Sequence, residues 1–174
     1  MILSLLKPRK PGKACRAVYE AIVATARHPK PYAEWGVPDT VDGRFDMITL
    51  HAVLVMERLH AGDAAARDFA QSLADEVFAD MDRSLREMGV GDLSVGKKVR
   101  KMAEVFYGRA FAYRPAFEAE DVKSLAGVLT RNVFAGLDAG GAEPLAAYAV
   151  SVRCHLQECA LASILSGVLV LPEP

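Results

Sequence analysis

Apolar side chains recur at intervals of three and four residues along almost the whole 174-residue chain. This spacing places them on one face of an α-helix. The clearest stripe lies between residues 69 and 88, where large apolar side chains stand mostly four apart. The two-residue alternation typical of a β-strand occurs only in the short segment 168–171. The pattern therefore predicts an all-α fold, a single compact domain of about six helices.

Glycine and proline divide these periodic stretches and set the expected helix boundaries. A first helix is expected over 13–28, followed by a long Pro/Gly-rich loop that ends at Gly43. The helix expected over 45–60 is apolar on nearly every face, which is typical of a central helix. Pro115 is expected to end the fourth helix, because proline lacks a backbone donor. The expected helices after the loop are 45–60, one with its apolar stripe over 69–88, 95–114, 122–137 and 143–166.

The chain length suits one domain with one sizeable core, and this helical domain is expected to cover residues 13–174. Residues 1–12 are expected to form a flexible basic N-terminal arm, because lysine and arginine follow a short apolar tip. A secretory signal has the opposite order, with its charge first. Three cysteines, an odd number, suit a reducing compartment, so a cytoplasmic location is expected.

Charge is balanced overall but uneven along the chain. The net charge is −1, which gives no indication of DNA as a partner. Residues 95–114 carry six basic residues and one acidic residue, whereas the helix before them is acidic. Two interpretations remain open. The two helices attract each other, or the basic residues form a docking surface.

No residue pattern predicts catalysis, a metal site or a cofactor. Residues 91–98 match most of a phosphate-binding loop, but Lys98 replaces its Ser or Thr and no strand precedes it. The group Cys154, His155 and Cys159 is too small for a closed zinc site, and buried core cysteines are the simpler interpretation. His51 lies in the most apolar helix and is typical of a core histidine. The carboxylates lie on periodic polar faces, so an enzyme is not expected.

Gly108 interrupts a helix within the segment Phe106-Tyr107-Gly108-Arg109. Glycine at such a position costs roughly 1 kcal/mol relative to alanine. One interpretation is that another helix of the domain packs closely against it. The other is that Gly108 belongs to a concave, partly apolar contact surface for another chain.

Short motifs follow one another in a fixed order between residues 15 and 135. They are Val37-Pro38-Asp39-Thr40, Gly43-Arg44-Phe45-Asp46, Leu50-His51, Leu85 to Gly89, Asp92 to Lys98, Phe106 to Arg109 with Tyr113, and Arg131-Asn132. In this ordered set the chain resembles the ubiquinol–cytochrome c chaperone family. The last forty residues carry no motif that we could match.

The resemblance implies an assembly chaperone rather than an enzyme, without a cofactor. It would bind newly made or unassembled cytochrome b and promote assembly of the respiratory ubiquinol–cytochrome c reductase complex. The ribosome, a small partner protein and peripheral contact with the inner membrane are further expectations. The residues leave two other functions open. One is a basic-helix ribosome- or RNA-binding module, and the other is a small helical haem-binding domain that uses His51 or His155.

Partner contacts are expected at aromatic and basic residues in or beside the matched motifs. Trp, Tyr and Arg dominate binding hot spots, and lysines are attracted to anionic lipid or RNA. The Pro/Gly-rich loop is expected to frame the contact surface. The candidate partner-binding residues are Tyr32, Trp35, Arg44, Lys97, Lys98, Lys101, Tyr107, Gly108 and Arg109.

Overall fold

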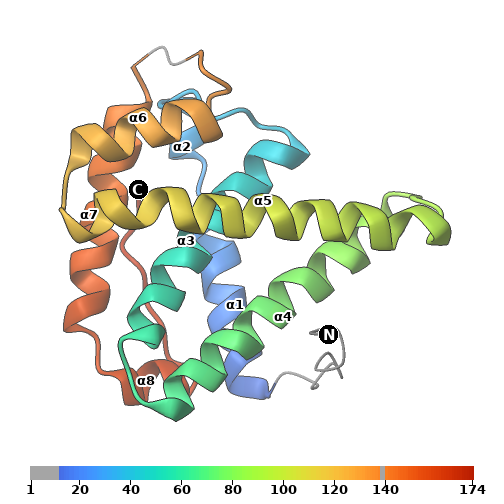
Figure 1. Ribbon diagram of the computed structural model, residues 1–174, viewed down its shortest axis with the longest axis horizontal. Helices are drawn as coiled ribbons and strands as arrows, with labels where there is room; N and C mark the ends of the chain where they lie inside the picture. The colour runs from blue at the N-terminus through green and yellow to red at the C-terminus, as the bar shows by residue number, and fades with distance from the viewer. Residues whose placement is uncertain (1–11, 138–139) are drawn as a thin grey trace.

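The structure is a computed structural model that describes residues 12–137 and 140–174 (Figure 1). All regular structure in these ranges is helical, which confirms the predicted all-α fold. Six helices are long and two are short. Their bounds are α1 Lys13–Ala26, α2 Lys30–Ala33, α3 Val41–His60, α4 Ala64–Glu87, α5 Asp92–Glu118, α6 Val122–Asn132, α7 Ala142–Glu158 and α8 Leu161–Leu165. The predicted N-terminal arm lies outside the described residues, apart from Gly12.

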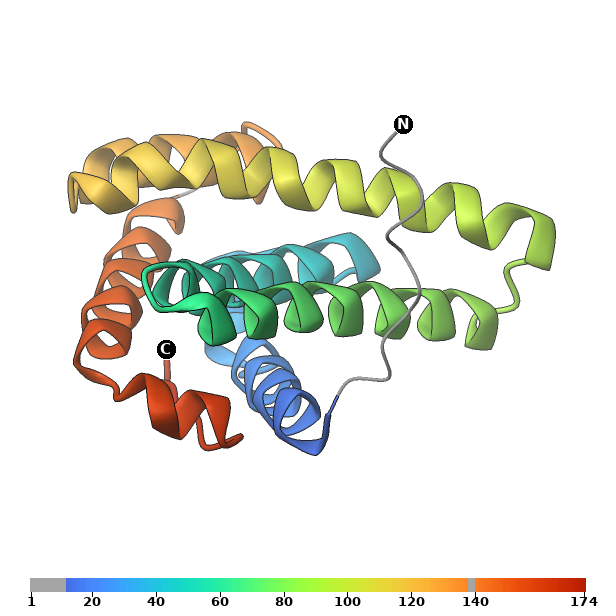
Figure 2. The same cartoon turned by 60° about the horizontal axis from the view of Figure 1, so that its bottom comes forward.

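Helix α3 lies at the centre of the fold, as its apolar sequence predicts. Every residue from Phe45 to Met56 is buried, and α1, α4, α5 and α7 pack against the helix. The α5–α6 layer covers one side of α3, and α1 lies on the other (Figure 2). The helix begins earlier than expected because Thr40 caps it, with the Gly43 N–H donating to Thr40 Oγ1 at 3.1 Å. None of the helices in the described part of the chain is long and apolar enough to cross a bilayer.

Three predicted boundaries are wrong. Pro115 lies inside α5, which continues to Glu118. Proline donates no backbone N–H to the carbonyl one turn earlier, but because Pro115 is exposed, water can reach that carbonyl. Helix α6 ends at Asn132 instead of near 137, because Ala135 and Gly136 have positive φ angles of 52° and 80°. The predicted helix 143–166 is divided by extended backbone at Cys159 and Ala160.

The C-terminal segment after α8 closes the core. Leu169 and Leu171 are buried in it. The Tyr148 hydroxyl lies 3.0 Å from the Pro172 carbonyl oxygen, and His155 Nε2 lies 3.0 Å from the Val170 carbonyl oxygen. These contacts fasten the segment along α7.

Helices α4 and α5 form an antiparallel hairpin whose far end projects from the body of the molecule (Figure 1). Acidic side chains of α4 pair mainly with arginines of the same helix, as Asp82 does with Arg86 at 2.6 Å. Of the α5 cations near the projecting end, Lys97, Lys98 and Arg100 form no ion pair within the described residues. The ion pair that joins the two helices, Arg86 with Asp92, has its cation on α4. Within the described residues no α4 carboxylate pairs with an α5 cation, so direct ion pairs do not support the attraction of an acidic α4 for a basic α5.

An ion pair between Asp46 and Arg109 joins α3 to α5, and both side chains are largely buried. Arg109 also donates through Nη2 to the Asn132 carbonyl oxygen at the end of α6, at 2.9 Å. Burial raises the pKa of Asp46 to about 6, and Arg109 opposes that shift. Asp46 and Glu76 are buried, so the expectation that the carboxylates lie on the surface is wrong for these two.

We expect Arg109→Met to lower the free energy of unfolding by about 3 kcal/mol or more, because it leaves a buried carboxylate without its partner. Because burial raises the pKa of Asp46 above its ordinary value of 3.8, the folded protein takes up a proton at this carboxyl as pH falls from 6 towards 4. The buried charge is then lost, and the carboxyl becomes less destabilising. The loss should therefore be larger at pH 8 than at pH 5. Urea unfolding at the two pH values measures it.

The exposed pair of Arg44 with Asp39, at 2.7 Å, provides the matched control. Arg44→Met should leave the free energy of unfolding nearly unchanged, because solvent screens an exposed pair. Equal losses for the two substitutions, or a loss at Arg109 that does not depend on pH, would contradict the role assigned to burial.

Candidate functional site

An apolar hollow of about 180 Å³ lies between α3 and α5. Phe78 of α4 packs beside it, with its ring centroid 5.5 Å from that of Phe106 and 5.9 Å from that of Tyr107. The three rings hold one wall of the hollow in place. The lining residues are Val53, Met56, Glu57, His60, Phe106, Tyr107, Ala110 and Arg114.

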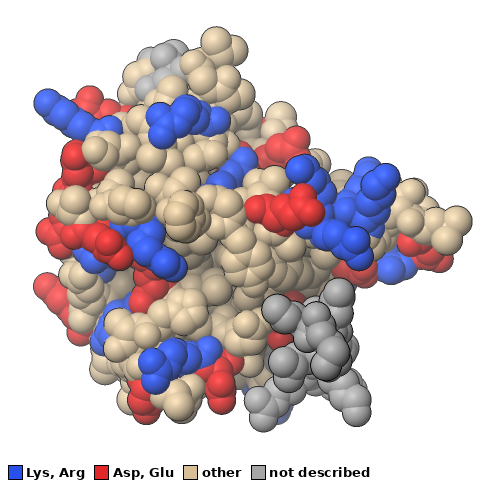
Figure 3. Space-filling model, viewed as in Figure 1, with Lys and Arg blue, Asp and Glu red and all other residues tan. Residues whose placement is uncertain are grey.

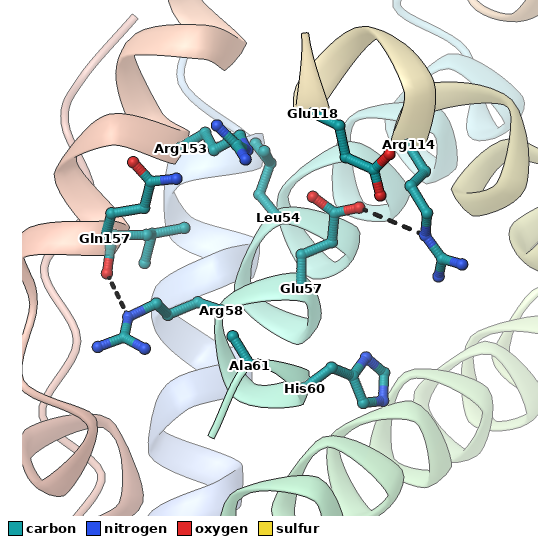
Figure 4. Close-up of a pocket in the computed structure, with 10 residues that line it drawn as sticks. Leu54, Glu57, Arg58, His60, Ala61, Arg114, Glu118, Arg153 and Gln157 are labelled. Carbon is teal, nitrogen blue, oxygen red and sulfur yellow. Dashed lines mark hydrogen bonds and ion pairs between the residues drawn. The ribbon is translucent and has the colours of Figure 1, made fainter. Parts of the chain in front are cut away.

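A larger and more polar hollow of about 640 Å³ adjoins the first, between α3, the end of α5 and α7 (Figure 4). Glu57, His60 and Arg114 line both hollows. We treat the two neighbouring hollows, which share these three residues, as one surface and call it the α3–α5 groove. Its floor is apolar near Val53 and its far end is charged.

The charged end of the groove contains both signs. Arg114 Nε lies 3.9 Å from Glu57 Oε1, and more than half of the Arg114 side chain is exposed. Burial raises the pKa of Glu57, while Arg153 and Arg114 oppose that shift. Arg58 is held by the fold, because it donates to the carbonyl oxygens of Leu156 and Cys159 at 2.8 and 2.9 Å. Arg114 is thus the cation of this end best placed to meet another molecule.

Aromatic side chains lie at and beside the outer rim of the groove. Tyr107, which lines the groove, is 50% exposed, and Phe111, one turn further along α5, is 78% exposed. Phe111 and Arg114 follow Tyr107 at spacings of four and seven, so the three share one face of α5. A Cβ atom added at Gly108 would meet nothing within 4 Å. The interpretation that a helix of the domain packs against Gly108 is therefore wrong, and the position faces open space.

The nine predicted partner-binding residues lie in different environments. Tyr107 lines the groove and Gly108, the next residue, faces open space, whereas Arg109 is turned inward to Asp46. Tyr32 is half-buried and its hydroxyl donates to the Ala26 carbonyl oxygen at 2.7 Å. The others are Trp35, half-buried with its ring centroid 5.8 Å from that of Tyr148, Arg44, exposed beside Asp39, and Lys97, Lys98 and Lys101, exposed on the first half of α5. Their partner-binding role stays a prediction.

The Pro/Gly-rich loop contributes no residue to the lining of the α3–α5 groove, which comes from α3, α5 and α7, so its expected role at the contact surface stays a prediction. Sequence reasoning also missed several groove residues. The periodic spacing contained a signal for Phe111 and Arg114, which share the helix stripe of Tyr107. It contained none for Val53 and Met56, which are indistinguishable in sequence from the other apolar residues of α3.

His51 is a fully buried core histidine, as expected. Its Nδ1 donates to the Met47 carbonyl oxygen at 2.7 Å, and its Nε2 lies 2.9 Å from the Tyr148 hydroxyl. Burial lowers the pKa of His51 to about 4, so the ring is neutral at pH 7. With both nitrogens engaged, His51 is not free to bind haem iron.

The other sequence motifs do not form a chemical site. The segment that matches a phosphate-binding loop belongs to α5 almost from its first residue. The interpretation of Cys154 and Cys159 as buried core residues is wrong for Cys154, which is exposed, and Cys159 is half-buried against the core. No cluster of three or more metal-ligating side chains occurs in the described ranges.

Three comparisons with known proteins agree. A family model described as ubiquinol-cytochrome C chaperone matches residues 33–171, which includes most of the C-terminal part left unmatched by sequence motifs. The chain is 22% identical over 120 residues to the ubiquinol-cytochrome-c reductase complex assembly factor 1 of Xenopus laevis. That alignment covers 69% of this chain and 60% of the relative, so the chain spans less than two thirds of its curated relative.

The structure is similar to the crystal structure of the Cbp3 homolog from Brucella abortus, with a TM-score of 0.83 and 40% sequence identity. The match covers 92% of this chain and 89% of that chain. The likeness therefore extends through almost the whole fold.

We expect Gly108→Ala to raise the free energy of unfolding by about 0.5–1 kcal/mol, because alanine is a better helix former and the added methyl group meets no atom. Gly43→Ala is the matched control within α3. Its Cβ would overlap the Pro38 carbonyl oxygen, so we expect a loss of about 1–3 kcal/mol. Thermal unfolding compares the two variants, and a loss of stability at Gly108 would show that the position is not open.

Proposed function

The chain belongs to the ubiquinol-cytochrome c chaperone family, and on that premise we propose that it binds newly made or unassembled cytochrome b. In doing so it promotes assembly of the respiratory ubiquinol–cytochrome c reductase complex. This is the work of an assembly chaperone and not of an enzyme. The observation that carries the proposal is the α3–α5 groove, with its apolar hollow and its exposed aromatic rim.

The apolar part of the groove suits a membrane subunit before assembly. Such a subunit presents apolar side chains that its later partners will cover, and contiguous apolar surface on a chaperone can cover them first. The hollow of about 180 Å³ next to Val53 and Met56 is of a size to admit a side chain. Tyr107 and Phe111 at the rim offer large contact areas at a low cost in conformational entropy.

The charged part of the groove supports recognition of a specific segment. Binding surfaces commonly surround an apolar centre with polar groups that set register and orientation. Arg114, Glu57 and Glu118 can do so here, because they lie at the end of the apolar hollow. We assign affinity to the aromatic rim and orientation to these charges.

The proposal places the chain in the cytoplasm at the periphery of the inner membrane, where its client is inserted. A small partner protein and the ribosome are further proposed partners that rest on the family alone. Of the two alternatives, haem binding through His51 is disfavoured by the hydrogen bonds that engage both of its nitrogens.

We expect deletion of the gene to lower the amounts of assembled complex and of cytochrome b, because an unprotected client is degraded or aggregates. Transcript levels should stay unchanged. Quantitative immunoblots and reduced-minus-oxidised haem spectra of the membranes measure the effect. A deletion strain with a normal amount of the complex would overturn the proposed function.

In affinity capture from detergent-solubilised membranes, we expect wild-type protein to retain cytochrome b. The double variant Tyr107→Ala/Phe111→Ser should bind it at least about tenfold more weakly, since buried aromatic contacts dominate binding energy. Leu93→Ser is the matched control. It alters a still more exposed apolar side chain of α5 about 21 Å from Tyr107, at 1.5 Å per residue. Equal capture by all three proteins would keep the function and remove the groove from it.

A further inference from the structure

The tip of the α4–α5 hairpin exposes large aliphatic side chains. Leu93, in the first turn of α5, is 102% exposed, and Met88, at the end of α4, is 53% exposed. The tip projects away from the other helices (Figure 1). Leu93 and Met88 therefore cannot be covered by the body of the domain in this arrangement.

Cations follow these apolar side chains directly. Lys97, Lys98 and Arg100 are exposed and form no ion pair in the part of the chain that the structure describes. In the space-filling view a group of Lys and Arg lies beside the apolar end of the hairpin (Figure 3). The acidic residues nearest the tip are Asp92, which is paired with Arg86, and Glu87 at the end of α4, and the three cations outnumber them. The local excess of charge is thus positive.

The spacing of these groups along α5 matches the depth profile of a bilayer surface. Lys97 and Arg100 follow Leu93 at intervals of four and seven, so they share its helix face. They lie about 6 and 10 Å from it along the helix axis. A headgroup layer is roughly 5–7 Å thick on each side of the hydrocarbon. With Leu93 at the hydrocarbon boundary, both cations can reach the headgroups, since long side chains extend toward charge.

We propose that the hairpin tip binds the surface of an anionic lipid bilayer. Leu93 and Met88 enter the boundary between headgroups and acyl chains, and Lys97, Lys98 and Arg100 bind lipid phosphates. This inference rests on the proposed location at the inner membrane and adds the surface that would make the lipid contact. It can fail separately from client binding, because the tip shares no residue with the groove.

The shape and residue types of the tip favour lipid over RNA. Proteins that bind single-stranded RNA stack bases on aromatic side chains, whereas the tip offers leucine and methionine. Aliphatic side chains beside lysine and arginine are typical of surfaces that lie in a membrane interface. A projecting tip also needs no complementary pocket to enter a fluid lipid layer.

Co-sedimentation of the full chain with lipid vesicles tests the proposal. Wild-type protein should bind vesicles of phosphatidylcholine with one third phosphatidylglycerol, and should bind pure phosphatidylcholine vesicles at least about tenfold more weakly. Leu93→Ser should weaken binding to the anionic vesicles about tenfold, and so should Lys97→Glu/Arg100→Glu.

Two control variants separate the tip from the rest of the chain. Lys123→Glu/Arg131→Glu changes as much charge on α6, at the far end of α5 from the tip, and should bind within about twofold of wild type. Tyr107→Ala should also bind vesicles normally. Tyr107→Ala is expected to weaken client capture only. The vesicle assay can therefore contradict the lipid proposal without contradicting client binding, and the reverse also holds.

Unchanged vesicle binding by the tip variants would overturn the proposal and assign any lipid contact to another segment. Absence of vesicle binding by the wild type would overturn it as well. If the wild type instead bound single-stranded RNA with a steep salt dependence that Lys97→Glu/Arg100→Glu removed, the cations would belong to an RNA surface.

Discussion

The ion pair between Asp46 and Arg109 fixes how α5 is turned about its own axis, and the groove depends on that rotation. With Arg109 directed toward α3 and α6, Phe106 packs into the core, while Tyr107 and Phe111 face outward. A buried pair adds little net stability over an apolar contact, but its directional bonds allow one rotation and penalise others. The aromatic rim therefore follows from a charge that cannot be seen at the surface.

Helix α3 is covered by other helices on almost every side, and it forms the floor of the groove where that cover is incomplete. Its C-terminal half meets α5 and α7 incompletely, and the hollows lie where that cover is missing. The apolar side chains that build the core thus continue without a break into the surface that we assign to the client. A surface of this kind is rigid, since Val53 and Met56 are held by the packing behind them.

The sequence predicted the helical elements well, because periodicity is local and each helix carries its own pattern. It failed where a side chain has a distant partner. Arg109 resembled an exposed contact residue, and nothing near it indicated that Asp46, 63 positions earlier, would bind it. Pro115 resembled a helix end because the exposure that makes it tolerable is a tertiary property. The groove was invisible for the same reason, since it joins residues near 55 with residues near 110.

The contacts that complete the core also set an order in time. His51 meets Tyr148, which follows it by 97 positions, and the segment with Leu171 is fastened to α7 still later in the chain. The most apolar helix is therefore synthesised early, and its last cover is synthesised late. Until α7 and the C-terminal segment emerge, α3 exposes the kind of surface that aggregates in unfinished proteins. The hazard from which we propose that this protein shields an incomplete membrane subunit is thus one that it meets during its own synthesis.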